Sequence, residues 1–194
     1  SLLMSTAEPL FEKDSGGNYY SLLKQGAGLA QVNSAINTKA YVTVEGCERP
    51  KAELGDSADG NFDKVINLTI HNFSDADLTY DLYAVALSSY ITSDGYDYYI
   101  LPNQRAMGED EVEINFDENR VTVPANSEAS VSVAITLTEA GKENLSVFEN
   151  GTFIEGYVFL EAADNGGIDL SVPYLGFYGD WGKAPVFDDT KYDD

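Results

Sequence analysis

The feature that most constrains the fold is a pair of apolar runs separated by a tight turn. The runs span Thr152–Ala162 and Ile168–Phe177, and the turn Asp164–Gly167 reads Asp-Asn-Gly-Gly. Such a turn supplies the positive φ that a tight hairpin needs, so the runs are predicted to form two antiparallel strands. We expect this hairpin to close a β-sandwich. An aromatic cluster at its end is expected to complete the closure: Tyr174, Phe177, Tyr178 and Trp181.

Composition and charge narrow the classes of function. The 194 residues include 33 acidic and 11 basic ones, which gives a formal net charge of −22. This charge repels nucleic acid and anionic lipid, because phosphate binding requires clustered lysine and arginine. No apolar run is long enough to span a membrane, and the sequence does not open on a signal-peptide pattern. A hydrophobic content of 43% supports a packed core.

Residues 1–39 differ in character from the rest of the chain. Leu2–Ala7 resembles the last turns of a helix that stops before Pro9, and this apolar start indicates a piece cut from a longer chain. Apolar residues at helical spacing predict a short amphipathic helix over Leu29–Ile36. Two interpretations stay open: a cap on the sandwich, or the edge of a preceding α/β domain. We expect the segment to pack near the first strand.

From Ala40 onward the pattern is that of β-strands. Alternation of apolar and polar residues is clearest in Ala129–Leu137, and acidic neighbours mark Val112–Phe116 as an edge strand. Arg120–Val123 is expected to lead into a turn. The fold class is therefore mainly β, an immunoglobulin-like or fibronectin type III-like β-sandwich over residues 40–181 with a short N-terminal helical segment. The predicted strands before the hairpin are Ala40–Val44, Lys64–His71, Leu78–Leu87, Val112–Phe116 and Ala129–Leu137.

Two insertions enlarge this sandwich beyond the roughly 100 residues typical of its class. Thr138 is placed to cap a short helix over Glu139–Val147, whose first turn holds an acidic residue. The tyrosine-rich stretch Ser88–Asp110 is expected to be an irregular connection. Residues 182–194 are acidic and without pattern, which is typical of a linker or a frayed end.

Residues with catalytic potential are few. His71 is the only histidine and lies on the polar face of a predicted strand, away from any glycine-flanked serine. A triad needs a histidine base beside a nucleophile and a carboxylate, so we interpret His71 as a surface residue. Cys47 is the only cysteine, which excludes an internal disulfide. It lies on an acidic loop, and a reactive thiolate would need a cationic neighbour and a base. We expect no catalytic residue in this chain.

The sequence also predicts no cofactor and no built metal site. Gly26-Ala27-Gly28 lacks the third glycine and the preceding strand of a dinucleotide-binding motif. Asp56–Asp63 resembles a calcium loop but fails the EF-hand pattern, because Ala58 stands at a ligand position. Asp94–Asp97 and Asp188–Asp194 are further acidic loops. Ca²⁺ at such loops is the one ion left to consider.

The tyrosines of Tyr90–Tyr99 allow two interpretations. They could form an aromatic platform for a sugar or a peptide, or they could pack against a neighbouring domain or the flank of the sandwich. Tyrosine serves both purposes, and we favour packing.

Three stretches resemble a known family. Tyr20, Ser21 and the run Gln25–Leu29 lie within YYSLLKQGAGLAQVNSAI, which resembles the end of the catalytic domain in subtilisin-like cell-envelope serine proteinases of Gram-positive bacteria, the lactocepin type. FENGTFIEGYVFLEA and VPYLGFYGDW are similar to the closing strands of the fibronectin type III-like domain that follows the protease domain in those enzymes. The resemblance extends over nearly the whole chain.

This resemblance implies a division into three parts. Residues 1–39 would be the C-terminal remnant of a subtilisin-like protease domain, residues 40–181 the fibronectin type III-like sandwich, and residues 182–194 a linker or tail. The family's nucleophile lies in a Gly-Thr-Ser-Met-Ala-type motif that this sequence lacks. The chain alone is therefore not expected to hydrolyse peptide bonds, whereas the longer protein is expected to be a serine endopeptidase.

The resemblance also implies a role and partners. In the family this domain packs against the protease domain, stabilises it and helps to shape substrate access. The expected partners are the protease domain of the same chain and the protein or peptide substrate of the longer protein, which would be secreted or attached to the cell wall. The alternative is a sugar- or peptide-binding β-sandwich module for adhesion.

Overall fold

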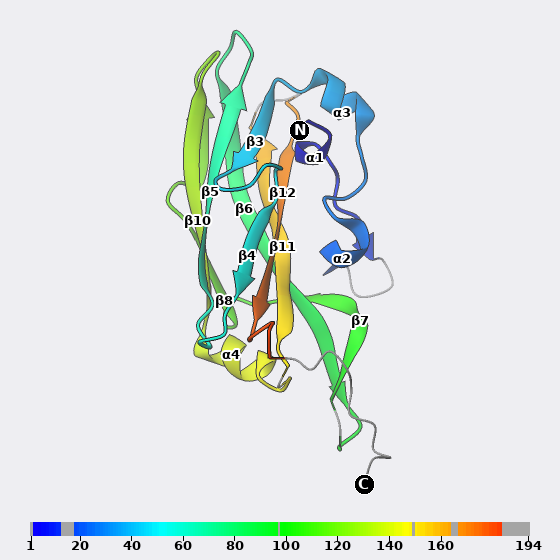
Figure 1. The fold of residues 1–194 in the computed structure, drawn as a ribbon. Coiled ribbons are helices and arrows are strands. Elements are labelled where there is room, and N and C mark those ends of the chain that lie inside the picture. Colours follow the sequence, from blue (N-terminus) through cyan, green and yellow to red (C-terminus); the bar gives the residue numbers. More distant parts are fainter. Residues whose placement is uncertain (1, 13–17, 97, 149, 164–166, 184–194) are drawn as a thin grey trace.

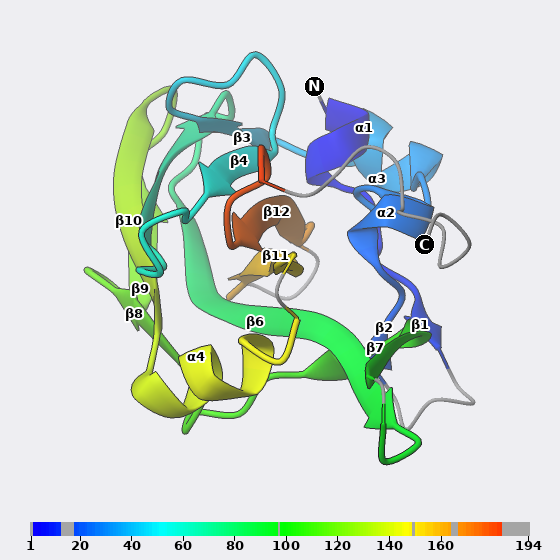
Figure 2. The same cartoon turned by 60° about the horizontal axis from the view of Figure 1, so that its bottom comes forward.

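Two large β-sheets pack face to face, and the N-terminal segment, which holds a third sheet of two short strands, lies on the outer side of one of them (Figures 1 and 2). The structure is a computed structural model that describes residues 2–12, 18–96, 98–148, 150–163 and 167–183. In chain order the elements are α1 (Leu2–Ser5), β1 (Phe11–Glu12), β2 (Asn18–Tyr19), α2 (Leu22–Gln25), α3 (Val32–Asn37), β3 (Ala40–Val44), β4 (Ala52–Asp56), β5 (Asp63–Asn72), β6 (Leu78–Ser93), β7 (Tyr98–Ala106), β8 (Val112–Phe116), β9 (Arg120–Val123), β10 (Glu128–Leu137), α4 (Glu139–Leu145), β11 (Thr152–Ala162) and β12 (Leu170–Tyr178).

The two sheets differ in size and in what covers them. The smaller sheet has the order β3-β5-β10-β8, and the larger one has the order β4-β12-β11-β6-β7 with β9 also paired to β6. This arrangement confirms the predicted mainly β sandwich. The edge position of β8 in the smaller sheet confirms the edge strand predicted from its acidic neighbours.

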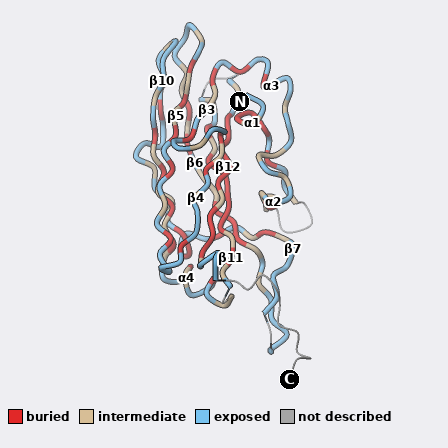
Figure 3. Tube along the Cα trace, viewed as in Figure 1, coloured by how far each residue is buried: buried red, intermediate tan, exposed pale blue. Residues whose placement is uncertain are grey.

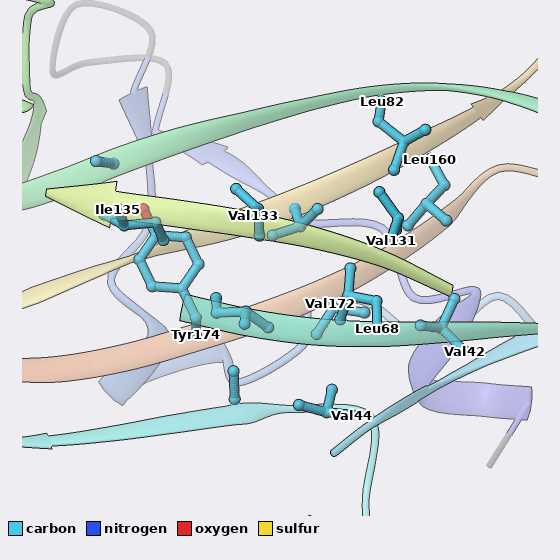
Figure 4. Packing of buried hydrophobic residues seen from close by; sticks show 14 of the residues in the cluster. Val42, Val44, Leu68, Leu82, Val131, Val133, Ile135, Leu160, Val172 and Tyr174 are labelled. Atoms are coloured by element: carbon cyan, nitrogen blue, oxygen red, sulfur yellow. The ribbon is translucent and has the colours of Figure 1, made fainter. Parts of the chain in front are cut away.

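The core lies between the sheets and follows from period-2 alternation. In β10 the residues Val131, Val133 and Ile135 are buried, while Ser132 and Ala134 between them are on the other face of the strand and only partly buried. Tyr80, Leu82 and Ala86 of β6, on the predicted strand Leu78–Leu87, belong to the same core. Figure 4 shows valine and leucine side chains from both sheets meeting in this layer.

The predicted hairpin of β11 and β12 is confirmed. It lies in the middle of the larger sheet, because β12 pairs in parallel with β4, a strand that the sequence analysis missed. The residues 164–166 of its predicted turn lie outside the described residues. The two strands of the hairpin are therefore interior strands of the larger sheet.

Strand alternation also divides the predicted aromatic cluster. Tyr174 and Tyr178 point into the sandwich core. Phe177 and Trp181 instead lie on the other side with Phe153, where the ring centroids of Phe177 and Trp181 are 5.0 Å apart. The expectation of one aromatic cluster was wrong because neighbouring residues of a strand face opposite sides of the sheet.

The tyrosine-rich stretch is not an irregular connection. β6 continues to Ser93 and pairs with β7 to form a long hairpin, here called the β6–β7 arm (Ser88–Ala106). The arm extends beyond the sandwich, and its outer half is exposed (Figures 1 and 3). Neither face of the outer half is buried, so its strands carry no alternation of apolar and polar residues from which pairing could be predicted. Arg120–Val123, expected to lead into a turn, is strand β9 paired with β6.

The short helices follow their local signals with shifted boundaries. The hydroxyl oxygen of Thr138 accepts a hydrogen bond from the Gly141 amide at 3.1 Å, which confirms the predicted cap of α4. α3 begins at Val32 rather than at Leu29, because the backbone of Leu29 pairs with Glu8 in an isolated bridge. Most of the predicted tail, residues 184–194, lies outside the described residues.

Gly156 provides a test of the central packing. A Cβ at this position would lie 1.9 Å from the Val85 carbonyl oxygen and 2.5 Å from the Tyr174 hydroxyl. We therefore expect Gly156→Ala to lower the free energy of unfolding by about 3 kcal/mol, because three strands must move apart. Urea unfolding measures this change.

Gly182→Ala is the matched control, since its Cβ would meet only the flexible Asp180 side chain at 3.3 Å. It should change the free energy of unfolding by less than about 0.5 kcal/mol. Equal stability of Gly156→Ala and the unchanged chain would contradict this account of the packing.

Candidate functional site

His71 lies in a polar row across the smaller sheet. Its Nε2 is 2.9 Å from the Thr43 hydroxyl, its Nδ1 is 3.1 Å from a Glu128 carboxylate oxygen, and its ring stacks on Tyr41 at 4.6 Å. The order hydroxyl, imidazole and carboxylate matches that of a catalytic triad. The row nevertheless lies on an open strand face, whereas a triad acts beside donors that bind an oxyanion. We interpret it as cross-strand contacts that stabilise the sheet.

The other predicted site residues are dispersed. Cys47 is half-buried and packs against the core. Within Asp56–Asp63, the Asp59 carboxylate accepts a hydrogen bond from the Asn61 amide at 3.0 Å and the Asp63 carboxylate accepts one from Thr136 at 2.9 Å. Asp94 accepts bonds from the Tyr96 amide and the Tyr99 hydroxyl. These carboxylates are thus engaged in local turns and strand contacts.

The described part of the chain holds no cluster of metal ligands. There, no three histidine, cysteine, aspartate or glutamate side chains come together as a metal site would require. Asp97 and Asp188–Asp194 lie outside that part. The described helices also include none with the length and apolar character needed to cross a membrane. Gly28 serves a turn, with φ of +110° and no room for a Cβ beside Glu8.

The most distinctive arrangement is the interface between the N-terminal segment (described residues 2–12 and 18–39) and the outer face of the larger sheet. Here β11 and β12 are buried on both faces, as Figure 3 shows along their length. One face belongs to the sandwich core. The other carries Glu155, Tyr157 and Ser171, whose polar atoms need partners because water is excluded.

Glu155 connects this face to helix α2. Its side chain is 1% exposed, and its Oε2 accepts hydrogen bonds from the Leu22 amide at 2.8 Å and the Ser21 hydroxyl at 3.2 Å. The Ser21 hydroxyl oxygen in turn accepts one from the Leu23 amide. The Leu22 amide at the start of α2 is thus satisfied by a carboxylate 133 residues away along the chain, and the Leu23 amide by the Ser21 hydroxyl that donates to the same carboxylate. Burial raises the pKa of the Glu155 carboxyl, and these hydrogen bonds only partly oppose the rise.

Further hydrogen bonds extend the same interface. The Tyr157 hydroxyl donates to the Gly26 carbonyl at 2.9 Å, and the Ser171 hydroxyl donates to the Ala7 carbonyl at 3.1 Å. The Val42 amide donates to the Ser5 hydroxyl at 3.3 Å. The bond between Val42 and Ser5 places the N-terminal segment against β3, the first predicted strand, as expected. The bonds of Tyr157 and Ser171 place the segment mainly on β11 and β12.

The opposite side of the N-terminal segment is apolar and exposed. Leu23 is 63% exposed, Val32 61% and Ile36 74%. The predicted amphipathic helix therefore does not turn its apolar residues toward the sandwich. Together with Leu3 and Leu29, which are also exposed, these side chains form what is here called the apolar outer face.

A buried ion pair holds the base of the β6–β7 arm. The Arg105 guanidinium donates to both carboxylate oxygens of Glu111 at 2.5 and 2.7 Å, and Asn144 of α4 donates to the same carboxylate at 2.9 Å. These donors lower the pKa of Glu111 to about 2, with Arg105 the largest cause. The exposed tip carries a different surface, in which Tyr96 is 95% exposed and Tyr98 is 55% exposed.

Sequence reasoning missed the residues that build the segment–sheet interface. Glu155 and Tyr157 were included only within an apolar run. One signal was present: a single carboxylate in the middle of a long apolar strand requires a specific partner, because burying an unpaired charge is costly. The partner itself could not be found from sequence.

The two packed, mostly antiparallel sheets place the chain in the class of immunoglobulin-like β-sandwich domains. Within that class, residues 53–175 match the family of Fn3-like domains, and the chain belongs to this family.

Two curated relatives match almost the whole chain. C5a peptidase of Streptococcus pyogenes serotype M18 is 31% identical over 192 residues, which is 99% of this chain and 16% of that protein. The PI-type proteinase of Lactococcus lactis subsp. cremoris is 28% identical over 193 residues, covering 95% of this chain and 9% of that protein. The predicted resemblance to large cell-envelope proteinases is confirmed. The chain spans only a small part of the length of these relatives.

The pH dependence of Glu155 tests the segment–sheet interface. Its pKa is raised in the folded chain above the unfolded value of about 4.3, so folding favours the protonated carboxyl. The stabilisation is fully present below the unfolded pKa and is lost as the pH rises through the folded pKa. We expect the unfolding free energy of the unchanged chain, relative to Glu155→Gln, to decline as the pH is raised from about 4 toward 8.

Urea unfolding of both proteins across this pH range measures the difference. The glutamine keeps an acceptor for the Leu22 amide but carries no charge, so it isolates the effect of ionisation. A difference that grows with pH would mean that the hydrogen bonds outweigh burial, and it would contradict this electrostatic account.

The ion pair at the base of the arm has the opposite pH dependence. The pKa of Glu111 is lowered to about 2 in the folded chain, so its contribution to stability is present above the unfolded pKa and is lost as the pH falls toward 2. Arg105→Ala leaves a carboxylate whose side chain is 8% exposed without its cation. We expect a loss of about 3 kcal/mol in unfolding free energy at neutral pH, and a smaller loss near pH 3.

Arg120→Ala is the control, because its ion pair with Asp81 is exposed on both sides. It should cost less than about 1 kcal/mol. If the two arginine variants were equally stable at neutral pH, the burial assigned to the Arg105 pair would have no energetic consequence.

Proposed function

We propose that this chain is a non-catalytic accessory part of a subtilisin-like serine endopeptidase and packs on the protease domain through the apolar outer face. The observation that carries the proposal is the exposure of Leu23, Val32 and Ile36 on a segment that is itself held rigidly to the sandwich. Several large apolar side chains exposed on one short segment are typical of an interaction surface. The two relatives, a peptidase and a proteinase far longer than this chain, support the proposal.

The proposal includes a division of the chain. Residues 1–39 would be the edge of the protease domain, residues 40–181 the Fn3-like sandwich, and residues 182–194 a linker or tail. The segment–sheet interface supports this division, because it would join the last part of the protease domain to the sandwich by buried hydrogen bonds. The sandwich would then stabilise the catalytic part by burying its last segment.

The β6–β7 arm is proposed to help shape substrate access. It projects from the side of the larger sheet on which the N-terminal segment lies (Figures 1 and 2). Lys24 of α2 contacts it by donating to the Pro102 carbonyl at 2.5 Å. An arm beside the protease domain would border the path of a protein or peptide substrate. The longer protein is proposed to be secreted or attached to the cell wall of a Gram-positive bacterium, as the family resemblance implies.

A second candidate function is a sugar- or peptide-binding module. The exposed Tyr96, Tyr98 and Tyr99 at the tip of the arm favour it, because exposed aromatic rings stack on sugars and peptides. Binding to a glycan or peptide panel that is lost in Tyr98→Ala would support this alternative. An absence of binding to the whole panel would contradict it.

The packing proposal is tested in the longer protein that contains the protease domain. Leu23→Asp combined with Ile36→Asp places two charges on the apolar outer face. We expect the melting temperature of the protease domain to fall by about 4 °C or more, because the buried charges weaken the interface. Differential scanning calorimetry and the half-life of peptidase activity on heating measure the effect.

The control is Val65→Asp, a substitution at a residue 59% exposed on the outer face of the smaller sheet. It should leave the melting temperature of the protease domain nearly unchanged. In the 194-residue chain alone, both sets of variants should unfold like the unchanged chain. The proposed packing surface would be rejected if, in the longer protein, the double variant and Val65→Asp lowered the melting temperature equally. It would also be rejected if neither variant lowered it.

A further inference from the structure

A cleft of about 450 Å³ lies between the N-terminal segment and the outer face of the larger sheet. Its walls come from parts of the chain that are far apart in sequence: β1, β2 and the start of α3 on one side, and β6, β11 and the start of β12 on the other. One segment–sheet hydrogen bond, from Ser171 to Ala7, lies in the wall of the cleft, whereas none of the residues of the apolar outer face lines it.

The floor of the cleft is a continuous aromatic strip. Phe159 of β11 and Tyr83 of β6 are direct cross-strand neighbours whose rings stack at 4.9 Å with an interplanar angle of 21°. Tyr19 continues the strip, 5.6 Å from Phe159 and 4.1 Å from Phe11. Tyr83 remains 40% exposed and Phe11 51% exposed. The facing sides of the stacked Tyr83 and Phe159 rings cover each other, and the exposure of Tyr83 and Phe11 leaves other aromatic surface of the strip accessible.

Carboxylates line the rim beside this strip. Glu161 and Asp169 border the cleft, and Glu161 lies directly opposite Asp81 on the neighbouring strand. Like charges in opposing positions of two strands destabilise a sheet. Asp81 is neutralised by Arg120, whereas Glu161 and Asp169 are in no ion pair formed among the described residues. The rim thus keeps an excess of negative charge next to aromatic rings.

One side-chain contact orients the rim toward the aromatic floor. The Tyr83 hydroxyl donates to Glu161 Oε1 at 3.2 Å. Burial together with the nearby Glu161 raises the pKa of Tyr83 to about 12, so the phenol keeps its proton at neutral pH. The Glu161 carboxylate is thereby held over the edge of the Tyr83–Phe159 stack.

We propose that this cleft binds the arginine side chain of a separate polypeptide, with the guanidinium stacked on the Tyr83–Phe159 pair and its N–H groups directed to Glu161 and Asp169. A planar guanidinium packs on aromatic rings and donates to carboxylates in a fixed fork, which matches accessible aromatic surface beside an acidic rim. A lysine ammonium would meet the charge but has no planar fork of donors. The net charge of −22 further favours the approach of a basic segment.

This inference goes beyond the accessory role and does not depend on it. The apolar outer face and the cleft use different residues, so the variants that test the two proposals are different. Failure of the packing test would leave the arginine site standing, and the reverse also holds.

The test is a titration of the 194-residue chain, labelled with ¹⁵N, with Nα-acetyl-arginine methylamide followed by nuclear magnetic resonance. Nα-acetyl-citrulline methylamide, which has the same shape without the charge, is the matched probe. We expect saturable shifts of the Tyr83, Phe159, Glu161 and Asp169 amides with the arginine probe, and affinity at least about threefold weaker with the citrulline probe. Tyr83→Leu and Glu161→Gln should each weaken arginine binding by about two- to fivefold.

Controls separate this site from general attraction to an acidic protein. Glu118→Gln removes one exposed carboxylate from the loop between β8 and β9 and should leave arginine binding unchanged. Equal weakening by Glu118→Gln and Glu161→Gln, or equal affinity for the arginine and citrulline probes, would overturn the proposal. So would tighter binding of a neutral sugar than of the arginine probe at these amides.

The same titration with the longer protein identifies the source of the arginine. Shifts that persist there support a separate polypeptide as the partner. If the arginine probe binds the 194-residue chain but not the longer protein, an internal side chain occupies the cleft and the proposal of a separate partner is overturned.

Discussion

The structure depends on the need to cover both faces of one central strand. Strand β11 presents Ile154, Val158 and Leu160 to the sandwich core, and Glu155 and Tyr157 to the opposite side. The second face buries a carboxylate and a phenol, and these groups are tolerated in the interior only with hydrogen-bond partners. The Leu22 amide and the Gly26 carbonyl of the N-terminal segment provide those partners. The segment is therefore part of the folded unit that contains the sandwich.

The N-terminal segment covers the outer face of the larger sheet, and it exposes an apolar face of its own. The smaller sheet turns a polar face with Thr43, His71 and Glu128 to solvent, and needs no further layer. The N-terminal segment, by contrast, contacts β11 through backbone hydrogen bonds and the ring of Tyr19. The side chains of Leu23, Val32 and Ile36 in this segment remain exposed. The proposed packing on a neighbouring domain rests on these exposed side chains of the N-terminal segment. The aromatic and acidic cleft is a separate feature, which forms where the N-terminal segment crosses the outer face of β6, β11 and β12.

The accuracy of the predictions from sequence depends on how much of each element is buried. Strands β5, β10 and β11 were predicted nearly to the residue, because one face or both are buried and the apolar pattern is then strict. The β6–β7 arm was missed because its outer half has no buried face to impose alternation, and β4 was missed because only Ala52 of its five residues is buried. The partners of Glu155 could not be predicted, since they lie more than 130 residues away and one of them is a backbone amide, which no residue type marks. For the same reason, the cleft lined by Phe11, Tyr83 and Phe159 becomes visible only when the fold brings these residues together.

Native-state hydrogen exchange of the 194-residue chain tests the central claim most directly. If the N-terminal segment and the sandwich form one unit, the Leu22 amide bonded to Glu155 should exchange about as slowly as the Val158 amide in the middle of β11, because both open only on global unfolding. Rapid exchange of the Leu22 amide and its neighbours in residues 2–12 and 18–39, with β11 still protected, would contradict the account. The segment would then be a loosely attached addition to a sandwich that is stable without it.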